Sequence, residues 1–505
     1  MKNRFINKIL VVLVIFLALT SCKKEFLETV PYGKLSVDNF YKTDADAQNA
    51  LIAAYDILQW TNAMDWQSNW LAKSLPSDES TAGGSSSGDQ PPLQELDKFN
   101  YSAGNTVIRD VYRSQYFGIY RCNMVIDNVE PTNDLRKKII AEAKCLRAYY
   151  YSELVRMFGK VPLILTELKT PGEYKQPQAE VAAIYAQIEK DLNEAIAVLP
   201  VKSAYATSDK FRVSKGTAQA LLGKVFLYEK KWKESSDAFE AVIASNEYQL
   251  SGDFSTLFTK SQEFGVESLM EVSYTTEKGY DWGTFQWGGN RNMENNITWQ
   301  LCGPRGDYFV AGNSGMIGGW GFNYPTKVMY DAYAANDVRR AATTWSIPDL
   351  KALGGDWTGT DAYGFNGYFR VKYGTFSSET GGPVNELNYG TNLRLIRYAD
   401  VLLMASEAYY RQTFEDKART ELNKVRTRAG LANVTATGTA LFDAIVKERQ
   451  TELAFEGFRF FDLVRWELAP SVLGSLGFVK GKHELFPIPL DEMTNNDLLD
   501  QNPLY

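Results

Sequence analysis

Histidine is almost absent from this chain of 505 residues, and the scarcity excludes several kinds of active site. The single histidine is His483. A zinc site with several imidazole ligands, or a His-x-x-x-His metalloprotease helix, cannot be built from one residue. A Ser-His-Asp triad would have to use His483. We therefore predict no metal site of these kinds and no histidine-based catalysis.

Cysteine is also scarce. The four cysteines are Cys22, Cys122, Cys145 and Cys302, and no two of them have Cys-x-x-Cys spacing. This spacing pattern excludes a thiolate metal cluster and a thioredoxin-like redox motif. Cys122 and Cys145 lie among helix-forming residues, so we predict that both are buried apolar side chains.

The sequence contains no cluster of lysine and arginine. The formal net charge is −7, and it becomes −10 when the leader cations Lys2, Arg4 and Lys8 are removed. Phosphate binding needs clustered basic residues. We therefore predict that nucleic acid is not a partner.

Cofactor motifs are missing as well. We find no Walker loop, dinucleotide fingerprint or EF-hand spacing, and predict no cofactor. The match to Gly-x-Ser-x-Gly at residues 84–88 lies in the Gly-, Ser- and Pro-rich segment 81–92, not at a strand-to-helix turn. This segment is predicted to be a flexible loop.

Long hydrophobic runs are limited to the N-terminus. Three cations precede an apolar run of 11 residues, Ile9–Leu19, which is too short to span a bilayer and is typical of a signal peptide. Small residues then precede Cys22, as in a bacterial lipobox. An ordinary secretory leader with a chance cysteine is the alternative. We predict a signal peptide over residues 1–21 and acylation of Cys22, because several acyl chains anchor a protein stably.

Helical periodicity dominates residues 36–250. The apolar spacing and the Gly and Pro stop signals predict helices over Asp44–Trp60, Leu135–Phe158 and Val181–Leu199. The spacing of Gly223, Phe226 and Phe239 is typical of a tetratricopeptide repeat, in which a small residue lets two helices approach closely. A second match has the same offsets at Ser406, Tyr409, Leu422 and Val425. Unrelated helical hairpins are the alternative.

Residues 251–390 differ in character. Within them, residues 274–324 hold eleven aromatic residues and eleven glycines, without helical periodicity. Short strands are predicted at Ser268–Thr275 and Gly367–Tyr373, with loops elsewhere. Long loops in compact proteins are usually functional. We predict a mainly α protein: a tetratricopeptide-like helical-repeat scaffold with a loop-rich insertion and few strands. The predicted regions are 1–21 (signal peptide), 22–35 (tether), 36–250 (helical), 251–390 (ligand-binding insertion) and 391–505 (helical region and tail).

Tryptophans in polar segments are the strongest functional signal. Indole rings stack on the apolar faces of sugar rings, while Asn, Asp and Arg side chains bind the hydroxyl groups. Trp66 and Trp70 lie one helical turn apart before the loop that carries Asp78. The other candidates lie in loops rich in Gly and Asn: Trp282, Trp287, Trp299 and Trp320. Core packing is the alternative for each of them. Tyr149–Tyr151 is instead predicted to pack between helices.

Carboxylates could in principle support glycoside hydrolysis, which needs no histidine. Asp78-Glu79 and the pair Asp356 and Asp361 lie in predicted loops. A chain with 61 carboxylates always offers such pairs. We therefore expect solvated surface charge and predict that the protein is not an enzyme.

Several long segments resemble a known family. Residues 141–163 (AEAKCLRAYYYSELVRMFGKVPL), 396–404 (IRYADVLLM), 448–466 (ERQTELAFEGFRFFDLVRW) and the ending 485–489 with 501–503 resemble SusD/RagB-family lipoproteins of Bacteroidetes. The resemblance runs from the lipobox to the last residues. It implies a tetratricopeptide scaffold with a ligand surface built by inserted loops.

The resemblance also implies an outer-membrane lipoprotein, lipid-anchored through Cys22 and facing the cell exterior. It would cap a SusC-like TonB-dependent transporter and deliver oligosaccharides to it. Asp78 and the loops from Trp282 to Trp320 correspond to the binding neighbourhood of the family. Six charged residues of the quoted segments are expected to form buried ion pairs rather than ligand contacts: Arg147, Glu153, Arg397, Asp400, Glu452 and Arg459.

Four functional hypotheses follow. The first is non-catalytic glycan capture, in which the six tryptophans stack sugars and Asp78 accepts hydrogen bonds from hydroxyl groups. The second is oligopeptide capture, as in RagB-like relatives. The third is a carboxylate-dependent glycosidase, and the fourth is a scaffold that binds only the transporter. The number of tryptophans favours glycan capture.

Overall fold

The computed structural model describes residues 40–62, 65–286, 293–359 and 362–505. Residues 47–505 form one compact unit, and residues 1–46 form another. In the smaller unit, the backbone N–H of Thr43 and that of Asp46 each donate to the other residue's side chain, over 2.8 and 3.1 Å. This exchange caps the helix that starts at Asp44. The predicted signal peptide, Cys22 and the tether lie outside the described residues, as do Trp287 and Asp361.

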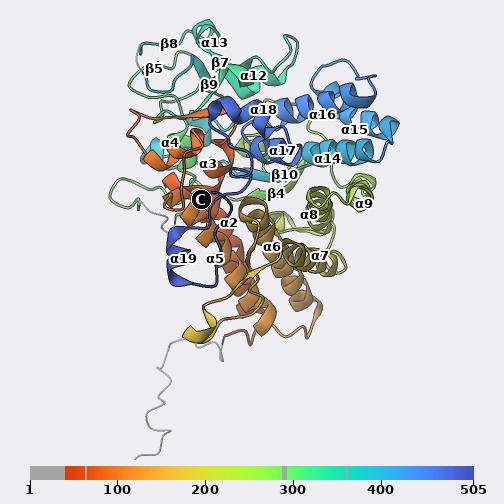
Figure 1. Ribbon diagram of the computed structural model, residues 1–505. Helices are drawn as coiled ribbons and strands as arrows, with labels where there is room; N and C mark the ends of the chain where they lie inside the picture. The colour runs from red at the N-terminus through yellow and green to blue at the C-terminus, as the bar shows by residue number, and fades with distance from the viewer. Residues whose placement is uncertain (1–39, 63–64, 287–292, 360–361) are drawn as a thin grey trace, which may run out of the picture. The chain divides into compact units, whose positions relative to one another are not determined.

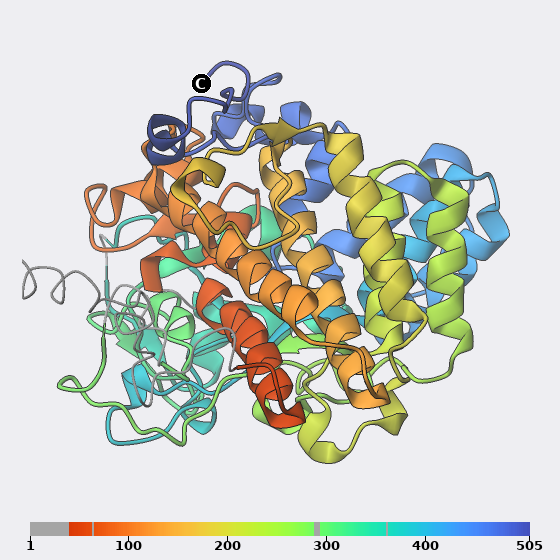
Figure 2. The same ribbon diagram turned by 90° about the horizontal axis from the view of Figure 1, so that it is seen from below.

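Strands are few and short, and helices account for about half of the structure. The longer ones are α2 (Asp44–Asn62), α5 (Thr106–Asn128), α6 (Asp134–Phe158), α7 (Val181–Ile196), α8 (Lys215–Tyr228), α9 (Trp232–Ala244), α14 (Tyr398–Arg411), α15 (Glu415–Arg428) and α16 (Gly438–Glu452). The helices from α5 to α9 and from α14 to α16 pack in series, each against the next, as Figure 2 shows for α6 to α9. The predicted mainly α fold is confirmed.

The three predicted helices are confirmed by α2, α6 and α7, with ends that differ by at most three residues. The N-terminus of α6 is capped by the Asn133 side chain, which accepts a hydrogen bond from the Arg136 N–H. The helix ends at Phe158, and its C-cap residue is Gly159, whose φ of +70° is a conformation that glycine adopts without strain. Tyr149, Tyr150 and Tyr151 are buried on α6, as predicted.

The two predicted repeat units are helical hairpins, α8–α9 and α14–α15. A Cβ atom on Gly223 would lie 2.6 Å from a ring carbon of Phe239, so only glycine permits this approach of α8 and α9. Ser235 donates a hydrogen bond to the Gly223 carbonyl oxygen over 2.8 Å, and Ser406 donates to that of Ala418 over 2.7 Å. Helix α14 packs against α9, which joins the two hairpins.

Shorter elements fill residues 247–397, where helices of the described residues have six residues or fewer. They are α10 (Thr298–Leu301), α11 (Lys327–Tyr330), α12 (Arg339–Thr343) and α13 (Ile347–Ala352). The predicted strands are present as β4 (Ser268–Val272) and β9 (Tyr368–Arg370). In Figure 1, α12 and α13 lie with several short strands at the end of the larger unit away from α7.

All strands of the described residues pair in two-stranded antiparallel sheets. The pairs are β1 (Ser80–Gly83) with β6 (Phe322–Pro325), β2 (Val161–Pro162) with β3 (Gln178–Ala179), β4 with β10 (Leu393–Arg397), β5 (Phe309–Val310) with β8 (Asp356–Trp357), and β7 (Thr344–Ser346) with β9. The remaining short helices are α3 (Asn69–Ser74), α4 (Pro91–Asp97), α17 (Arg459–Arg465), α18 (Ala469–Leu473) and α19 (Leu490–Asn495).

Buried ion pairs hold distant segments together. Arg397 at the end of β10 binds Glu267, Glu452 and Glu456, all nearly inaccessible to solvent. Glu452 also accepts a hydrogen bond from Arg339 over 2.8 Å. The six charged residues predicted to be buried and paired all are, since Arg147 binds Asp191, Arg449 binds Asp400, Lys73 binds Glu153 and Arg459 binds Asp78.

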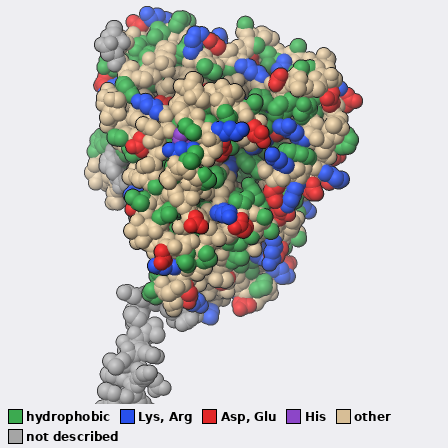
Figure 3. Space-filling model, viewed as in Figure 1, with side chains coloured by type: hydrophobic (Ala, Val, Ile, Leu, Met, Phe, Trp, Pro, Cys, Tyr) green, Lys and Arg blue, Asp and Glu red, His purple; other side chains and the backbone are tan. Residues whose placement is uncertain are grey.

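Cys122, Cys145 and Cys302 are buried free thiols, which confirms the prediction for the first two. Burial raises the pKa of all three thiols, that of Cys302 to about 11. Among the described residues, none of the helices combines the length and the apolar character needed to cross a bilayer. On the face drawn in Figure 3, basic and acidic side chains are interspersed.

Candidate functional site

Three cavities in the larger unit differ in size and lining. An inner cavity of about 30 Å³ lies among α3, α6 and α8. A groove of about 630 Å³ follows α5 and carries the exposed rings of Phe117, Tyr120 and Tyr174. A cleft of about 990 Å³ is lined by Trp66, Trp282 and Trp320, and we call it the tryptophan cleft. The last has three tryptophans in its lining, whereas each of the other two has one, and its volume is typical of ligand sites.

The floor of the tryptophan cleft is an aromatic pair. The rings of Trp66 and Trp320 stack with centroids 5.8 Å apart and an angle of 29° between planes. Phe322 packs edge-on against Trp66 with centroids 5.0 Å apart. Trp66 and Trp320 are half-buried, whereas Phe322 is buried. The pair therefore presents fixed indole surface to the cleft.

Glycines set the position of Trp320. Residues 318–321 run beside residues 300–306, and the Trp320 N–H donates to the Gln300 carbonyl oxygen over 3.1 Å. A Cβ atom on Gly319 would lie 2.5 Å from the Cα of Gly303, and one on Gly318 would lie 2.6 Å from that of Gly306. Such distances leave no room for a side chain. The glycine-rich composition of this region therefore serves a close approach of two backbone segments.

A buried amide holds the loop that carries Trp282. Asn388 is inaccessible to solvent, accepts from the Tyr280 N–H over 2.7 Å and donates to the Tyr280 carbonyl oxygen over 2.8 Å. The adjoining residues Pro383 and Val384 line the cleft beside Trp282. Trp282 itself is 53% exposed. An exposed indole on an anchored loop is suited to ligand contact.

Polar side chains complete the lining. Arg305 binds Asp307 over 2.7 Å, and Asp89 accepts hydrogen bonds from the backbone and hydroxyl of Ser85 over 2.8 Å each. Glu386 also lines the cleft, close to Pro383 in the sequence. With three carboxylates and one guanidinium, the cleft has excess negative charge. These groups can accept hydrogen bonds from hydroxyl groups of an uncharged ligand.

The predictions for Trp70 and Trp299 are wrong. Each is 1% exposed, and their rings meet edge to face with centroids 5.4 Å apart. Trp70 donates its ring N–H to the Phe455 carbonyl oxygen over 2.9 Å, and Trp299 donates to that of Thr391 over 3.1 Å. Their hydrogen-bonding capacity is met inside the protein and their faces are covered, so both belong to the core.

The prediction that Asp78 accepts hydrogen bonds from ligand is also wrong. Asp78 is 6% exposed, and both of its carboxylate oxygens bind Arg459, over 2.7 and 2.8 Å. The neighbouring Glu79 is buried, and burial raises its pKa to about 8, with the charge of Asp78 adding to the shift. This pair of carboxylates faces the interior, so it offers no hydrolytic site at the surface.

The remaining carboxylate candidate has a surface partner. Asp356 is 3.1 Å from Lys351, and Asp361 lies outside the described residues. Among the described residues, no group of three His, Cys, Asp or Glu side chains could hold a metal ion.

Sequence reasoning missed the polar half of the cleft, namely Asp89, Arg305, Asp307 and Glu386. Asp89 lies in the segment 81–92, which the sequence predicts to be a flexible loop, yet Gly84 donates to the Gly321 carbonyl oxygen over 2.7 Å and ties this segment to the residue after Trp320. Arg305 and Asp307 flank a glycine within the aromatic-rich stretch, which is the signal that could have pointed to them.

The chain matches two family descriptions and is similar to several known proteins in sequence and in structure. Residues 349–476 match the SusD family, and residues 25–227 match the family described as "Starch-binding associating with outer membrane". A laminarin-binding SusD-like protein of known structure is 33% identical, with a TM-score of 0.84 over 92% of this chain and 100% of that chain. The surface glycan-binding protein A of Bacteroides thetaiotaomicron, solved with laminarihexaose, is 26% identical, with a TM-score of 0.79 over 91% and 100%. SusD-like protein P2 of Formosa agariphila is 28% identical over 98% of both chains.

Proposed function

This chain belongs to the SusD family, and we propose that it binds oligosaccharides in the tryptophan cleft without hydrolysing them and delivers them to a SusC-like TonB-dependent transporter. The stacked pair of Trp66 and Trp320 is the observation that carries the proposal. A fixed aromatic surface matches the apolar face of a sugar ring, and its rigidity lowers the entropic cost of binding.

The charge of the cleft supports uncharged sugars as ligands. Asp89, Asp307 and Glu386 would repel the carboxylates or sulfates of acidic glycans, because like charges across an interface oppose binding. Laminarin and laminarihexaose are the first ligands to test, since two of the similar structures are a laminarin-binding protein and a laminarihexaose complex.

The sequence supports an outer-membrane location. Acylation of Cys22 would anchor the mature chain, and the second matched family is described as associating with the outer membrane. In this proposal the protein faces the cell exterior, where polysaccharides are met. Incorporation of labelled fatty acid, lost in Cys22→Ala, tests the anchor.

The binding proposal is tested by titration of the chain lacking residues 1–22. Tryptophan fluorescence or calorimetry would follow binding of laminarihexaose, other neutral oligosaccharides, acidic oligosaccharides and peptides. We expect saturable binding of a neutral sugar, a loss of about tenfold or more in Trp320→Ala, and no release of reducing ends. A loss of this size corresponds to about 1.4 kcal/mol, the range of one aromatic contact.

Two variants serve as controls. Trp232→Ala removes a half-buried tryptophan on α9, outside the cleft, and should leave the affinity unchanged. Tyr120→Ala removes an exposed ring from the groove along α5. Binding that is lost in Tyr120→Ala and kept in Trp320→Ala would move the site to that groove. Binding of peptides with none of sugars would replace the proposal by oligopeptide capture.

A further inference from the structure

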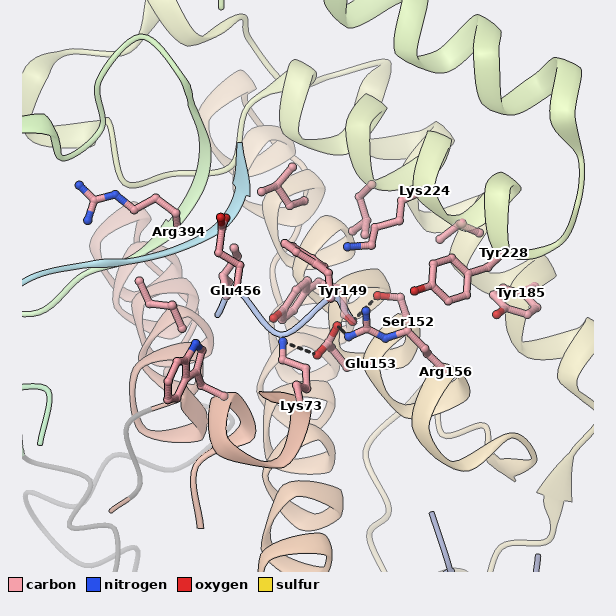
Figure 4. A pocket seen from close by; sticks show the side chains of 17 residues that line it. Lys73, Tyr149, Ser152, Glu153, Arg156, Tyr185, Lys224, Tyr228, Arg394 and Glu456 are labelled. Atoms are coloured by element: carbon pink, nitrogen blue, oxygen red, sulfur yellow. Dashed lines mark hydrogen bonds and ion pairs between the residues drawn. The ribbon is translucent and has the colours of Figure 1, made fainter. Parts of the chain in front are cut away.

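The inner cavity lies where the helical repeats meet the C-terminal segment. Its lining comes from Lys73 on α3, Tyr149 and Arg156 on α6, Lys224 on α8, and residues 393–396 of β10. Figure 4 shows Lys73, Glu153, Arg156 and Lys224 directed toward one another, while Arg394 points away. The volume of about 30 Å³ exceeds the minimum that holds one water molecule, roughly 10–15 Å³ on the same measure. The inner cavity and the tryptophan cleft share no lining residue.

Positive charge exceeds negative charge around this cavity. The cations are Lys73, Arg156 and Lys224, and the carboxylate directed at them is Glu153. Glu153 accepts hydrogen bonds from Lys73 over 3.1 Å and from Arg156. Glu456, the other carboxylate of the lining, is bound by Lys372 over 2.6 Å and by Arg397. Three cations therefore have two nearby carboxylates, Glu153 and Asp400, and Asp400 is shared with Arg449.

Several donors that border the cavity are not used by the protein. Arg156 is 9% exposed, and its Nε and Nη1 atoms have no hydrogen-bond partner among the described residues. The Tyr149 hydroxyl has none there either. The Tyr228 hydroxyl lies close enough to the Arg156 guanidinium to interact with it. Buried donors without acceptors are destabilising, most of all when charged, so an acceptor is expected beside them.

Lys224 is the least satisfied of the cations. Its Nζ atom lies 3.8 Å from Asp400 Oδ2, beyond hydrogen-bond distance, and 4.2 Å from the centroid of the Phe458 ring. Burial lowers the pKa of Lys224 to about 8, and the nearby charge of Arg156 adds to the shift. Burial alone would raise the pKa of Glu153, yet Arg156, Lys73 and Lys224 hold it at about 2. The pKa of Lys224 is lowered mainly by burial and is raised by Asp400, whereas the lowered pKa of Glu153 reflects a positive local field.

We propose that the inner cavity binds one small monovalent inorganic anion of the chloride class, held by Arg156, Lys224 and the Tyr149 hydroxyl. A halide is little larger than a water molecule and accepts hydrogen bonds in any direction. Water would also accept from these donors, but it would leave the excess positive charge in place. The anion would join α6 and α8 to the segment of Phe458, so its role is structural.

Bromide soaking tests the site directly. Crystals of the chain lacking residues 1–22, soaked in sodium bromide, would be measured at the bromine absorption edge. We expect an anomalous peak inside the cavity, within contact distance of Arg156 and Lys224. A cavity without a peak, holding water alone, would overturn the proposal. This measurement uses the unaltered protein, so it does not depend on the folding of a variant.

Thermal unfolding tests the same site in solution. In sodium chloride, Tm should exceed that in sodium gluconate of equal ionic strength by about 1–2 °C, since a ligand that binds only the folded state stabilises it. Lys224→Met should lose this difference, and the exposed control Lys233→Met should keep it. Equal Tm in both salts for the unaltered protein, or a difference that Lys224→Met retains, would contradict the proposal.

Discussion

Arg370 lies between two indole rings in the core. Its guanidinium carbon is 4.7 Å from the centroid of the Trp70 ring and 5.4 Å from that of Trp299, and it is 2% exposed. Burial lowers its pKa below the ordinary value. The two rings therefore stabilise a cation of the protein itself, which gives these tryptophans a structural purpose.

For this reason, Trp299→Ala should lower the stability of the protein, whereas Trp282→Ala should weaken its binding of sugar. Trp299→Ala removes a fully buried ring and its contact with Arg370, so the free energy of unfolding should fall by about 3–5 kcal/mol. Trp282→Ala should change it by about 0.5 kcal/mol or less while weakening sugar binding. Urea unfolding and sugar titration of both variants measure the two effects. A fully stable Trp299→Ala would refute the core assignment.

Asp78→Ala should destabilise the protein without changing which ligand it binds. The change leaves Arg459 buried without its partner, which typically costs about 3–5 kcal/mol. The double variant Asp78→Ala with Arg459→Met should recover part of the loss, because no charge remains unpaired. Urea unfolding of the three variants measures the recovery. If Asp78→Ala is as stable as the parent but fails to bind sugar, Asp78 is a ligand contact after all.

Glu79 should make stability depend on pH. Its pKa is about 8 in the folded state against an ordinary value of 4.5, so the folded state binds more protons between these limits. Stability from this group is complete below about pH 4.5 and is lost as pH rises through 8. In Glu79→Gln the side chain stays neutral, and a carbonyl oxygen can still accept from the Phe455 N–H. The difference in Tm between Glu79→Gln and the parent should therefore become more favourable to the variant between pH 5 and pH 9. A difference that stays constant with pH would refute the raised pKa of Glu79.

At the scale of elements, the paired segments 300–306 and 318–321 control the cleft. Gly319→Ala would place a Cβ atom 2.5 Å from Gly303 and force the segments apart, which displaces Trp320. We expect weaker sugar binding by about tenfold or more and a lower Tm. Gly172→Ala is the matched control, since a Cβ atom there meets nothing within 4 Å. Unchanged binding in Gly319→Ala would show that the approach of the segments does not position the indole.

Local signals predicted the long helices and could not predict the cleft. The ends of α6 follow from Asn133 and Gly159, which act on their own neighbours in the sequence. The spacing of Gly223 and Phe239 predicted a close hairpin for the same reason. In contrast, Trp320 meets Trp66 from more than 250 positions away, and Asp78 meets Arg459 from 381 away. Trp66 and Trp70 lie four positions apart in one segment, yet the first lines the cleft and the second is buried, so only the fold separates core from surface.

At the scale of the whole molecule, the ion pairs around Arg397 should make residues 47–505 unfold together. They link Glu267, just before β4, to β10 and α16, and these segments come from two of the regions predicted from the sequence, 251–390 and 391–505. We expect one calorimetric transition, because these segments share contacts that must break at once. Glu452→Gln should move the whole transition to lower temperature. Two separated transitions would instead support independent regions.

The three buried thiols can report local unfolding of the protein through their reaction with an alkylating reagent. Iodoacetamide reacts with thiolates, and Cys122, Cys145 and Cys302 are inaccessible and kept protonated by burial. Each sits in a different part of the chain, on α5, on α6 and after α10. The rate of alkylation of each cysteine, measured by mass spectrometry, would therefore give the rate at which its segment becomes exposed, without any added label. The same inertness leaves these side chains resistant to oxidation for as long as the fold stays closed.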